Sequence, residues 1–161
     1  MTASARIQVT GAQDAVKALR KIDPELRKQF NADVKRITAP IVDDAKSKYP
    51  PTMLSGMERT WSQRGNKKFP YDSKRAQRGV KSKIDTSRKA ASLIRVQQTD
   101  PAAAIIEVAG KGKSNPLGTA LNRFGQPSRF LWPAAERNLG KVEAEMKSSV
   151  LDVIRTVERQ L

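Results

Sequence analysis

The sequence predicts a single α+β domain in which a small antiparallel sheet packs against two long helices. Three observations support this class. Apolar residues recur at helical spacing in the first third of the chain, a second such stripe occupies its last quarter, and short β-rich runs bounded by Gly and Pro lie between them. At 161 residues the chain has the length of one domain, so the prediction is one unit over 1–161.

The N-terminal segment predicts a strand followed by a short helix. Ala5 to Thr10 alternates between apolar and polar residues and stops at Gly11, as a half-buried strand does. Residues 12–22 then place three apolar side chains at helical spacing, which predicts a helix of about three turns. Those side chains are Val16, Leu19 and Ile22.

A long helix is predicted to begin at Asp23-Pro24-Glu25, because Asp is a good N-cap residue and Pro is favoured at the first helical position. Its apolar stripe consists of Leu26, Phe30, Val34, Ile37, Ile41 and Ala45. Pro40 lacks an amide hydrogen, so we expect a bend or a split near Ala39. Tyr49-Pro50-Pro51 is predicted to end the helix.

A long, irregular and basic excursion is predicted from Pro50 to Arg78. The segment contains several Gly and Pro residues and only isolated aromatics. The range from Arg59 to Arg95 contains twelve Lys and Arg residues but only two acidic residues. Loops of this length without structure of their own are commonly functional or disordered. The candidate DNA-facing or partner-facing residues of this arm and its continuation are Arg64, Lys67, Lys68, Lys74, Arg75, Arg78, Lys81 and Lys83.

Three interpretations of the basic arm remain open from the sequence. Lys and Arg side chains could contact phosphates and release counterions, they could face an acidic protein surface, or they could keep a solvated loop soluble. A base-stacking platform is less favoured, because no RRM, OB-fold or helix-turn-helix pattern accompanies the aromatics Trp61, Phe69 and Tyr71.

The sheet is predicted from the middle of the chain. A short strand is expected within 79–87, with Val80 and Ile84 as its apolar positions. Ser92 to Thr99 and Ala102 to Ala109 are both β-rich and are separated by Asp100-Pro101, which predicts a hairpin. The loop that follows lacks the Walker spacing, so we do not predict a nucleotide site.

The segment from Phe124 to Ala135 is predicted to lead into the C-terminal helix, with Pro133 as its first residue. We expect Phe130 and Leu131 to close the core, and we take Phe124, Arg129 and Trp132 as candidate intersubunit contacts. The terminal helix carries an apolar stripe formed by Leu139, Val142, Met146, Val150, Val153, Val157 and Leu161, widened by Leu151 and Ile154.

The composition argues against catalysis and against a cofactor or metal. The chain has no Cys and no His, so the commonest nucleophile–base pairs and metal ligands are missing. A hydrolase or nuclease would have to use Asp43 and Asp44, but adjacent helical residues diverge by ~100°. No apolar run approaches the length of a membrane helix, so we expect a protein made in the cytoplasm without a membrane partner.

Two stretches resemble a known family. Ile7-Gln8-Val9-Thr10-Gly11, followed by Ala15 to Ile22, and Arg129-Phe130-Leu131-Trp132-Pro133-Ala134 are similar to the opening and closing signatures of the neck and tail-completion family of long-tailed bacteriophages. That family is also labelled minor tail component or head-tail connector. The order of predicted elements agrees over nearly the whole chain. Pro51 to Gly56 departs from the family's small turn after the long helix, and the basic excursion follows it.

The resemblance implies a non-enzymatic virion protein of the neck, which joins the DNA-filled head to the tail as a subunit of a homo-oligomeric ring. Its implied neighbours are the head-closure or connector protein and the tail terminator, with possible non-specific contact with DNA in the channel. Ring symmetry requires two different contact faces on each copy. The alternative that the sequence leaves open is a standalone basic nucleic-acid-binding protein.

Overall fold

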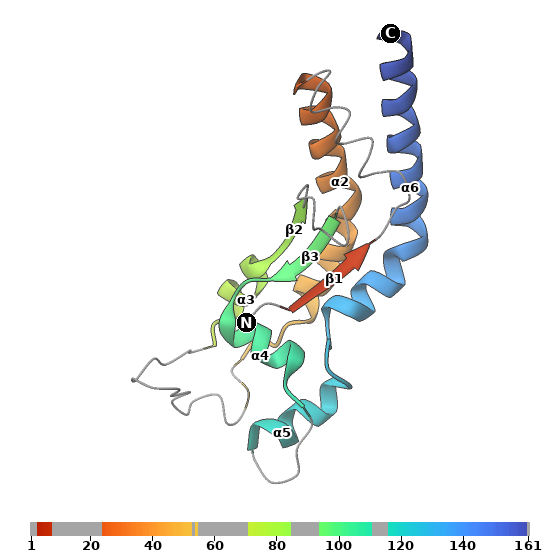
Figure 1. The fold of residues 1–161 in the computed structure, drawn as a ribbon. Helices are drawn as coiled ribbons and strands as arrows, with labels where there is room; N and C mark the ends of the chain where they lie inside the picture. Colours follow the sequence, from red (N-terminus) through yellow and green to blue (C-terminus); the bar gives the residue numbers. More distant parts are fainter. Residues whose placement is uncertain are drawn as a thin grey trace.

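The computed structural model describes residues 3–7, 24–52, 54, 71–84, 94–110 and 116–160 (Figure 1). The helix predicted over 12–22 and the arm residues Arg64, Lys67 and Lys68 lie outside these ranges. Within them the α+β class is confirmed: a small antiparallel sheet packs on a long helix from the N-terminal half and a long C-terminal helix.

The sheet has three strands in the order β1-β3-β2, with β3 antiparallel to both neighbours. The strands are β1 (Ala3–Ile7), β2 (Val80–Ile84) and β3 (Ile94–Gln98). β3 lies within the predicted strand Ser92 to Thr99, and it buries Ile94, Val96 and Gln98 while the intervening residues are partly exposed. β1 begins two residues before the strand that the sequence predicts, and residues 8–10 of that prediction lie outside the described ranges.

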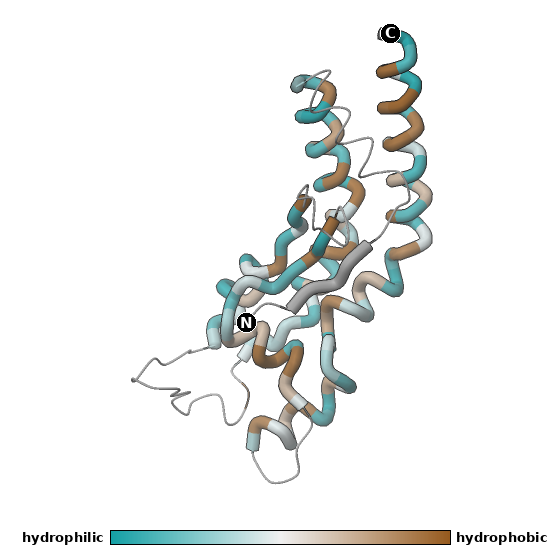
Figure 2. Tube along the Cα trace, in the orientation of Figure 1, coloured by the Kyte–Doolittle hydropathy of each residue, from teal (hydrophilic) through white to brown (hydrophobic). Residues whose placement is uncertain are grey.

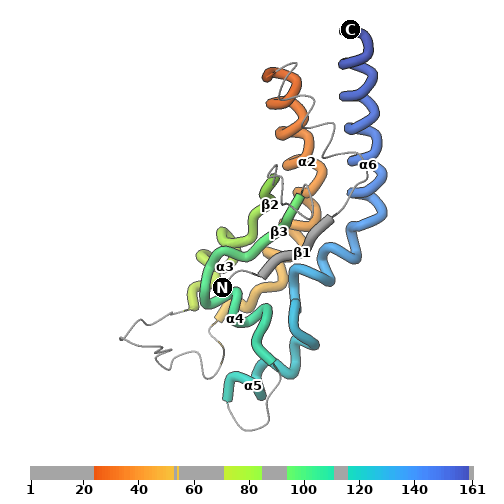
Figure 3. Tube along the Cα trace, in the orientation of Figure 1, coloured from red at the N-terminus to blue at the C-terminus, as the bar shows by residue number. Residues whose placement is uncertain are grey.

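Two long helices lie side by side and antiparallel: α2 (Pro24–Lys48) and α6 (Leu131–Gln160) (Figure 3). Hydrophobic residues recur along both of them (Figure 2). The predicted α2 stripe is confirmed, since all of its members after Leu26 are buried. α2 is not split at Pro40, because the buried side chains on either side, Ile37 and Ile41, keep packing across the lost hydrogen bond.

Two ion pairs fix the register of α2 against α6. Arg36 Nη1 lies 3.7 Å from Glu145 Oε2, and eight residues further along α2 Asp44 Oδ2 accepts a 2.9 Å hydrogen bond from Arg137 Nε, eight residues back along α6. The Arg137 guanidinium lowers the pKa of Asp44. This register shows which residue of α6 lies at the same height along the helix pair as a given residue of α2.

The predicted strand over 102–109 is wrong: these residues belong to helix α4 (Pro101–Val108). Asp100 caps the helix by accepting a 3.0 Å hydrogen bond from the Ala103 amide, and Pro101 occupies its first turn. Three consecutive alanines favour a helix and are all buried. The hairpin partner of β3 is therefore not the segment after it; β3 pairs with β1 and β2.

The predicted C-terminal bound of the irregular arm, Arg78, is also wrong. Residues 73–79 form helix α3 (Ser73–Gly79), which leads directly into β2. Asp72 caps it by accepting a 2.7 Å hydrogen bond from the Arg75 amide, and Ala76 is buried on its inner side. The arm residues 53 and 55–70 lie outside the described ranges. Arg78 is thus a helical residue.

The chain reaches α6 through α5 (Pro116–Leu121) and a 3-10 turn at Asn122–Phe124. α6 begins at Leu131, two residues before the predicted start, and its first turn is closed by a 3.1 Å hydrogen bond from the Ala134 amide to the Phe130 carbonyl. Pro133 fits there because amides of the first turn have no intrahelical partner. Among the described residues no helix is both long and apolar enough to span a membrane.

Candidate functional site

Basic residues line up across the face of the sheet that points away from the core. In the antiparallel register Lys83 lies opposite Arg95, and Arg95 lies opposite Arg6 on the other side. Ile94 and Val96, which alternate with Arg95, are buried, so Arg95 belongs to the outer face. Strands β2 and β3 therefore place Lys83 and Arg95 side by side on this face, and Arg6 is paired with Arg95 in the backbone register of β1.

Further cations continue this row beyond the sheet. Lys81 is exposed on β2, two residues from Lys83, and Lys74 and Arg78 are exposed on α3, which leads into that strand. No ion pair joins these four side chains to an acidic residue within the described part of the chain. We call Lys74, Arg78, Lys81, Lys83 and Arg95 the basic face.

Arg75 does not belong to the basic face, although the sequence places it among the arm cations. Its Nε and Nη2 donate hydrogen bonds of 3.2 and 2.9 Å to Asp100 Oδ2, and the Asp100 side chain is 6% exposed. These two charge-assisted hydrogen bonds to one carboxylate oxygen tie α3 to the start of α4. Arg75 is therefore a structural residue, and removing it would disturb the fold.

The basic face has two physical interpretations. An anion placed over the exposed side chains of Lys74, Arg78, Lys81 and Lys83 would be attracted by four cations on one surface. Lysines on an edge strand such as β2 also discourage pairing with another sheet. Because the cations extend to α3, beyond the edge strand, edge protection does not account for the whole face.

A second cluster holds the start of α6. The Glu107 carboxylate, fully buried at the end of α4, accepts hydrogen bonds from the Tyr49 hydroxyl at 2.7 Å and from the amides of Phe130 and Leu131 at 3.2 Å each. Two amides without intrahelical partners are thereby satisfied by a side chain distant in sequence. The Tyr49 and Phe130 rings pack with centroids 4.8 Å apart. We call Tyr49, Glu107, Arg129, Phe130 and Leu131 the capping cluster.

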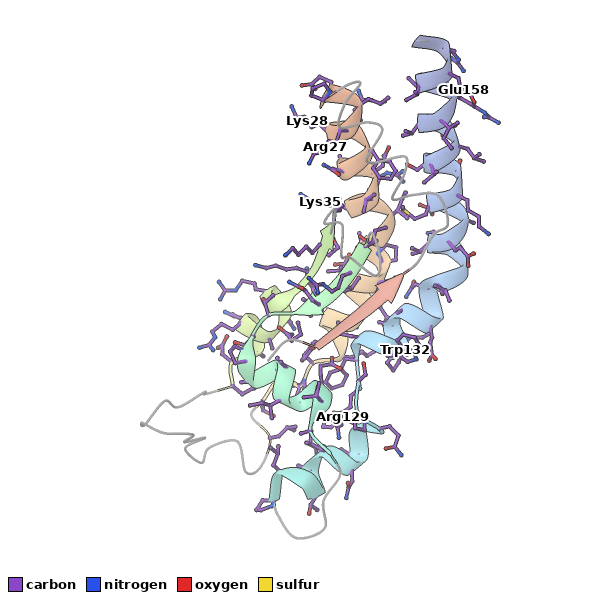
Figure 4. The ribbon with its side chains drawn as sticks, in the orientation of Figure 1. Arg27, Lys28, Lys35, Arg129, Trp132 and Glu158 are labelled. Carbon is purple, nitrogen blue, oxygen red and sulfur yellow. The ribbon has the colours of Figure 1, made fainter. Side chains whose placement is uncertain are left out.

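Arg129 belongs to this cluster, and its prediction as an intersubunit contact is not supported by its burial. Its side chain lies inside the protein at 5% exposure, and Nη1 donates hydrogen bonds to the carbonyls of Ile106 at 2.7 Å and Glu107 at 3.3 Å. Burial lowers the pKa of the guanidinium, and the nearby Glu107 carboxylate opposes that shift. The guanidinium thus joins α4 to the segment before α6 (Figure 4).

The two other predicted contact residues differ in exposure. Phe124 is half-buried and packs edge-on against Phe130, with ring centroids 5.7 Å apart, so it mainly supports the capping cluster. Trp132 is 50% exposed and its indole nitrogen donates a 2.7 Å hydrogen bond to Glu136. Of the three, Trp132 alone keeps a large surface for a partner.

The contribution of Glu107 to the free energy of unfolding should decrease as the pH rises, which is the opposite of the usual behaviour of a carboxyl group. Burial raises the pKa of its carboxyl above the ordinary 4.5, although the bonds from Tyr49, Phe130 and Leu131 oppose this. A group with a raised folded-state pKa binds more protons when folded, so its contribution is full below the ordinary pKa and falls as pH rises through the folded pKa. We expect chemical denaturation of Glu107→Gln to lose this decrease above pH 4.5, whereas a Glu143→Gln control keeps it.

Sequence reasoning missed the capping cluster as a unit. Glu107 could have indicated a buried polar cluster, because it is the one acidic residue in an apolar run from Pro101 to Gly110. Its partners Tyr49 and Phe130 are 58 and 23 residues away in sequence, and no local pattern joins them.

No group of three or more His, Cys, Asp or Glu that could hold a metal ion occurs among the residues that the structure describes. The lone carboxylates considered in the sequence are engaged on the surface: Asp43 lies 3.9 Å from Lys46, and Asp44 pairs with Arg137. Comparison of the chain with protein-family models, curated proteins and solved structures finds no significant match.

Proposed function

We propose that this chain is a structural protein of the bacteriophage neck, which joins the DNA-filled head to the tail as one subunit of a ring. The observation that carries the proposal is the basic face, which lies on the outer side of the sheet, opposite the core side covered by α2. In a ring of such subunits this face would point towards the channel, where its cations meet phosphates or an acidic neighbouring ring.

The resemblance of the two end segments to the tail-completion family supports the same proposal. The closing segment from Phe130 to Ala134 has a clear structural role here. Phe130, Leu131 and Ala134 are buried, while Trp132 points outward at the start of α6. An aromatic segment followed by Pro and Ala therefore anchors the terminal helix, and a rigid anchored helix suits a subunit that must present fixed contact faces.

The position of the chain in the virion tests this proposal. Antibodies against the chain, applied to disrupted particles and imaged by immunogold electron microscopy, should label the junction between head and tail. Labelling confined to the capsid shell or the tail tip would contradict a neck location. The gene should also lie beside genes for a portal, a capsid and a tail tube.

The basic face also fits the second candidate function, that of a standalone nucleic-acid-binding protein. A binder of this kind loses affinity steeply with salt, with a slope that falls by about 0.9 for each phosphate contact removed. Lys74→Ala, Arg78→Ala, Lys81→Ala and Lys83→Ala combined should lower the slope by about 3 to 4 if all four contact duplex DNA. Fluorescence anisotropy across a salt series measures it.

The two candidates differ in what the free protein does. A neck subunit gathers many weak contacts only when a ring is formed, so the isolated chain should bind duplex DNA weakly and the fourfold variant should change little. Lys141→Ala serves as the control, because it removes an exposed cation from α6, away from the basic face. Tight binding by the isolated chain, lost in the fourfold variant but kept in the control, would favour the standalone binder.

A further inference from the structure

We propose that copies of this chain bind one another head to tail through two different helix faces. The outer flank of α6, formed by Leu151, Ile154 and Glu158, would seat on the outer face of α2 of the next copy. This inference deepens the proposed function, on which it rests, by naming the contact that would build the ring. The two faces and their relative height are fixed by the described residues.

The α6 flank presents unusually large apolar side chains to solvent. Leu151 is 51% exposed and Ile154 is 40% exposed, while the neighbouring stripe residues Val150 and Val153 are 6% exposed. Leu151 and Ile154 are three residues apart and therefore adjacent on the helix surface. Glu158 lies four residues beyond Ile154 on the same flank, exposed and without an ion pair to any described residue.

The α2 face has the shape that receives such side chains. Lys28, Asn31, Ala32 and Lys35 stand at i, i+3, i+4 and i+7, which are the four positions that form a hole in knobs-into-holes packing. These residues, with Pro24 and Arg27, line a surface hollow of about 520 Å³. Lys28, Ala32 and Lys35 are exposed, whereas Asn31 is partly buried and its Oδ1 is shielded from solvent, so a Leu knob would pack chiefly over Ala32.

The two faces stand at the same height along the helices. In the register set by the Arg36–Glu145 pair, Leu151 lies six residues beyond Glu145 and is level with the α2 residue six before Arg36, which is Phe30. That level is within one or two residues of Asn31 and Ala32. Rotation about an axis parallel to α2 and α6 preserves height, so it brings Leu151 of one copy to the hole of the next.

Charge complements the packing at the end of the contact. Glu158 is level with the start of α2, where Arg27 and Lys28 lie. Arg27 has no ion pair with a described acidic residue, and Lys28 has only a 3.9 Å contact with Glu25 in which both side chains are about four-fifths exposed. A Glu158 carboxylate arriving from the next copy would therefore meet two available cations.

The two faces lie on opposite sides of the helix pair. Arg27, Lys28 and Lys35 project from α2 away from α6, and Glu158 projects from α6 away from α2 (Figure 4). A single copy cannot satisfy both faces, and each copy binds one neighbour through each. Such a heterologous contact closes into a ring when its rotation divides the circle.

Engineered cysteines test the contact cleanly, because the chain has none of its own. Two full-length single variants, Ala32→Cys and Leu151→Cys, are prepared, mixed and oxidised at high protein concentration. We expect disulfide-linked dimers containing one chain of each variant, identified by mass, and few dimers from either variant alone. The matched control mixes Ala32→Cys with Lys141→Cys, whose Lys141 side chain is 68% exposed on another face of α6.

The outcomes separate this inference from the proposed function. A yield of mixed dimers several-fold above the control supports the head-to-tail contact. Adding Glu158→Lys to the Leu151→Cys chain should reduce this yield. Adding Arg27→Glu to the Ala32→Cys chain as well should restore it. Leu151→Cys dimers alone, or a mixed yield no higher than the control, would overturn it. In either of those cases the neck location remains to be judged by the immunogold result.

Discussion

Replacing Glu107 with Ala is expected to lower the free energy of unfolding by about 3–5 kcal/mol, the cost of breaking a buried charged network by removing one member. The change leaves the Tyr49 hydroxyl and the amides of Phe130 and Leu131 without their acceptor. It also removes the negative charge nearest to the buried Arg129 guanidinium. Urea denaturation followed by circular dichroism measures the loss.

The capping cluster predicts where the damage should concentrate. Because Glu107 satisfies the first amides of α6, hydrogen exchange in the Ala variant should accelerate at the start of that helix more than at its centre. Glu143→Ala is the control, since Glu143 forms only a surface pair with Lys147 at 3.0 Å and its loss should cost less than about 1 kcal/mol. Equal losses in the two variants would contradict a capping role for Glu107.

The second large effect is expected at Gly79, where α3 meets β2. A β-carbon built there would overlap the side-chain oxygen of Gln98 and approach the Asp100 amide nitrogen to 2.9 Å. Gln98 cannot move aside without loss, because it is fully buried, donates to the Ala76 carbonyl at 2.8 Å and accepts from the Asp100 amide at 2.8 Å. Gly79→Ala should therefore destabilise by about 2–4 kcal/mol, combining overpacking with the loss of buried hydrogen bonds.

Gly140→Ala is the matched control for Gly79. Gly140 lies within α6 and a β-carbon there would meet nothing within 4 Å, so Ala should stabilise the helix by up to about 1 kcal/mol. The two substitutions are chemically identical and should change the melting temperature in opposite directions. A neutral Gly79→Ala variant would show that the Gln98 bridge between α3 and α4 is not required.

The helices with long apolar stripes could be predicted from the sequence, because burial of one helix face repeats along the chain. The buried residues Phe30 and Ile41 in α2 and Met146 in α6 all belong to stripes identified by spacing. The stripe also held α2 together through Pro40. The residue at which a helix begins was less predictable. α6 begins at Leu131 because its first amides are capped by Glu107, which belongs to a different element.

The second predicted strand of the hairpin illustrates why short apolar runs mislead. Ile105, Ile106 and Val108 are β-branched and suggest a strand, whereas Asp100 and Pro101 mark a helix start. The capping residues determined the structure of this segment, and β3 instead pairs with the preceding strand β2 and with the distant strand β1. The basic face depends on the pairing of β2 with β3 and on the position of helix α3, which the sequence pattern predicted as loop, so it could not be assembled from sequence alone.

The candidate intersubunit residues required knowledge of burial for the same reason. Aromatic residues are frequent both in interfaces and in cores, so the sequence did not separate the two cases for Phe124. Arg is rarely buried unless it is paired, so the buried position of Arg129 could not be expected without knowing its carbonyl partners. The structure places both against the capping cluster and leaves Trp132 exposed. It also presents Leu151 and Ile154, which the sequence identified only as a widening of the α6 stripe.

The proposal that this chain joins heads to tails is tested most directly by inactivating its gene, which the proposal places in a phage genome. Electron microscopy of the resulting lysate should show DNA-filled heads and complete tails that remain separate, and joined particles should return when the intact chain is supplied from a plasmid. Particles that join normally without the chain, or heads that fail to fill with DNA, would contradict a role in head–tail joining.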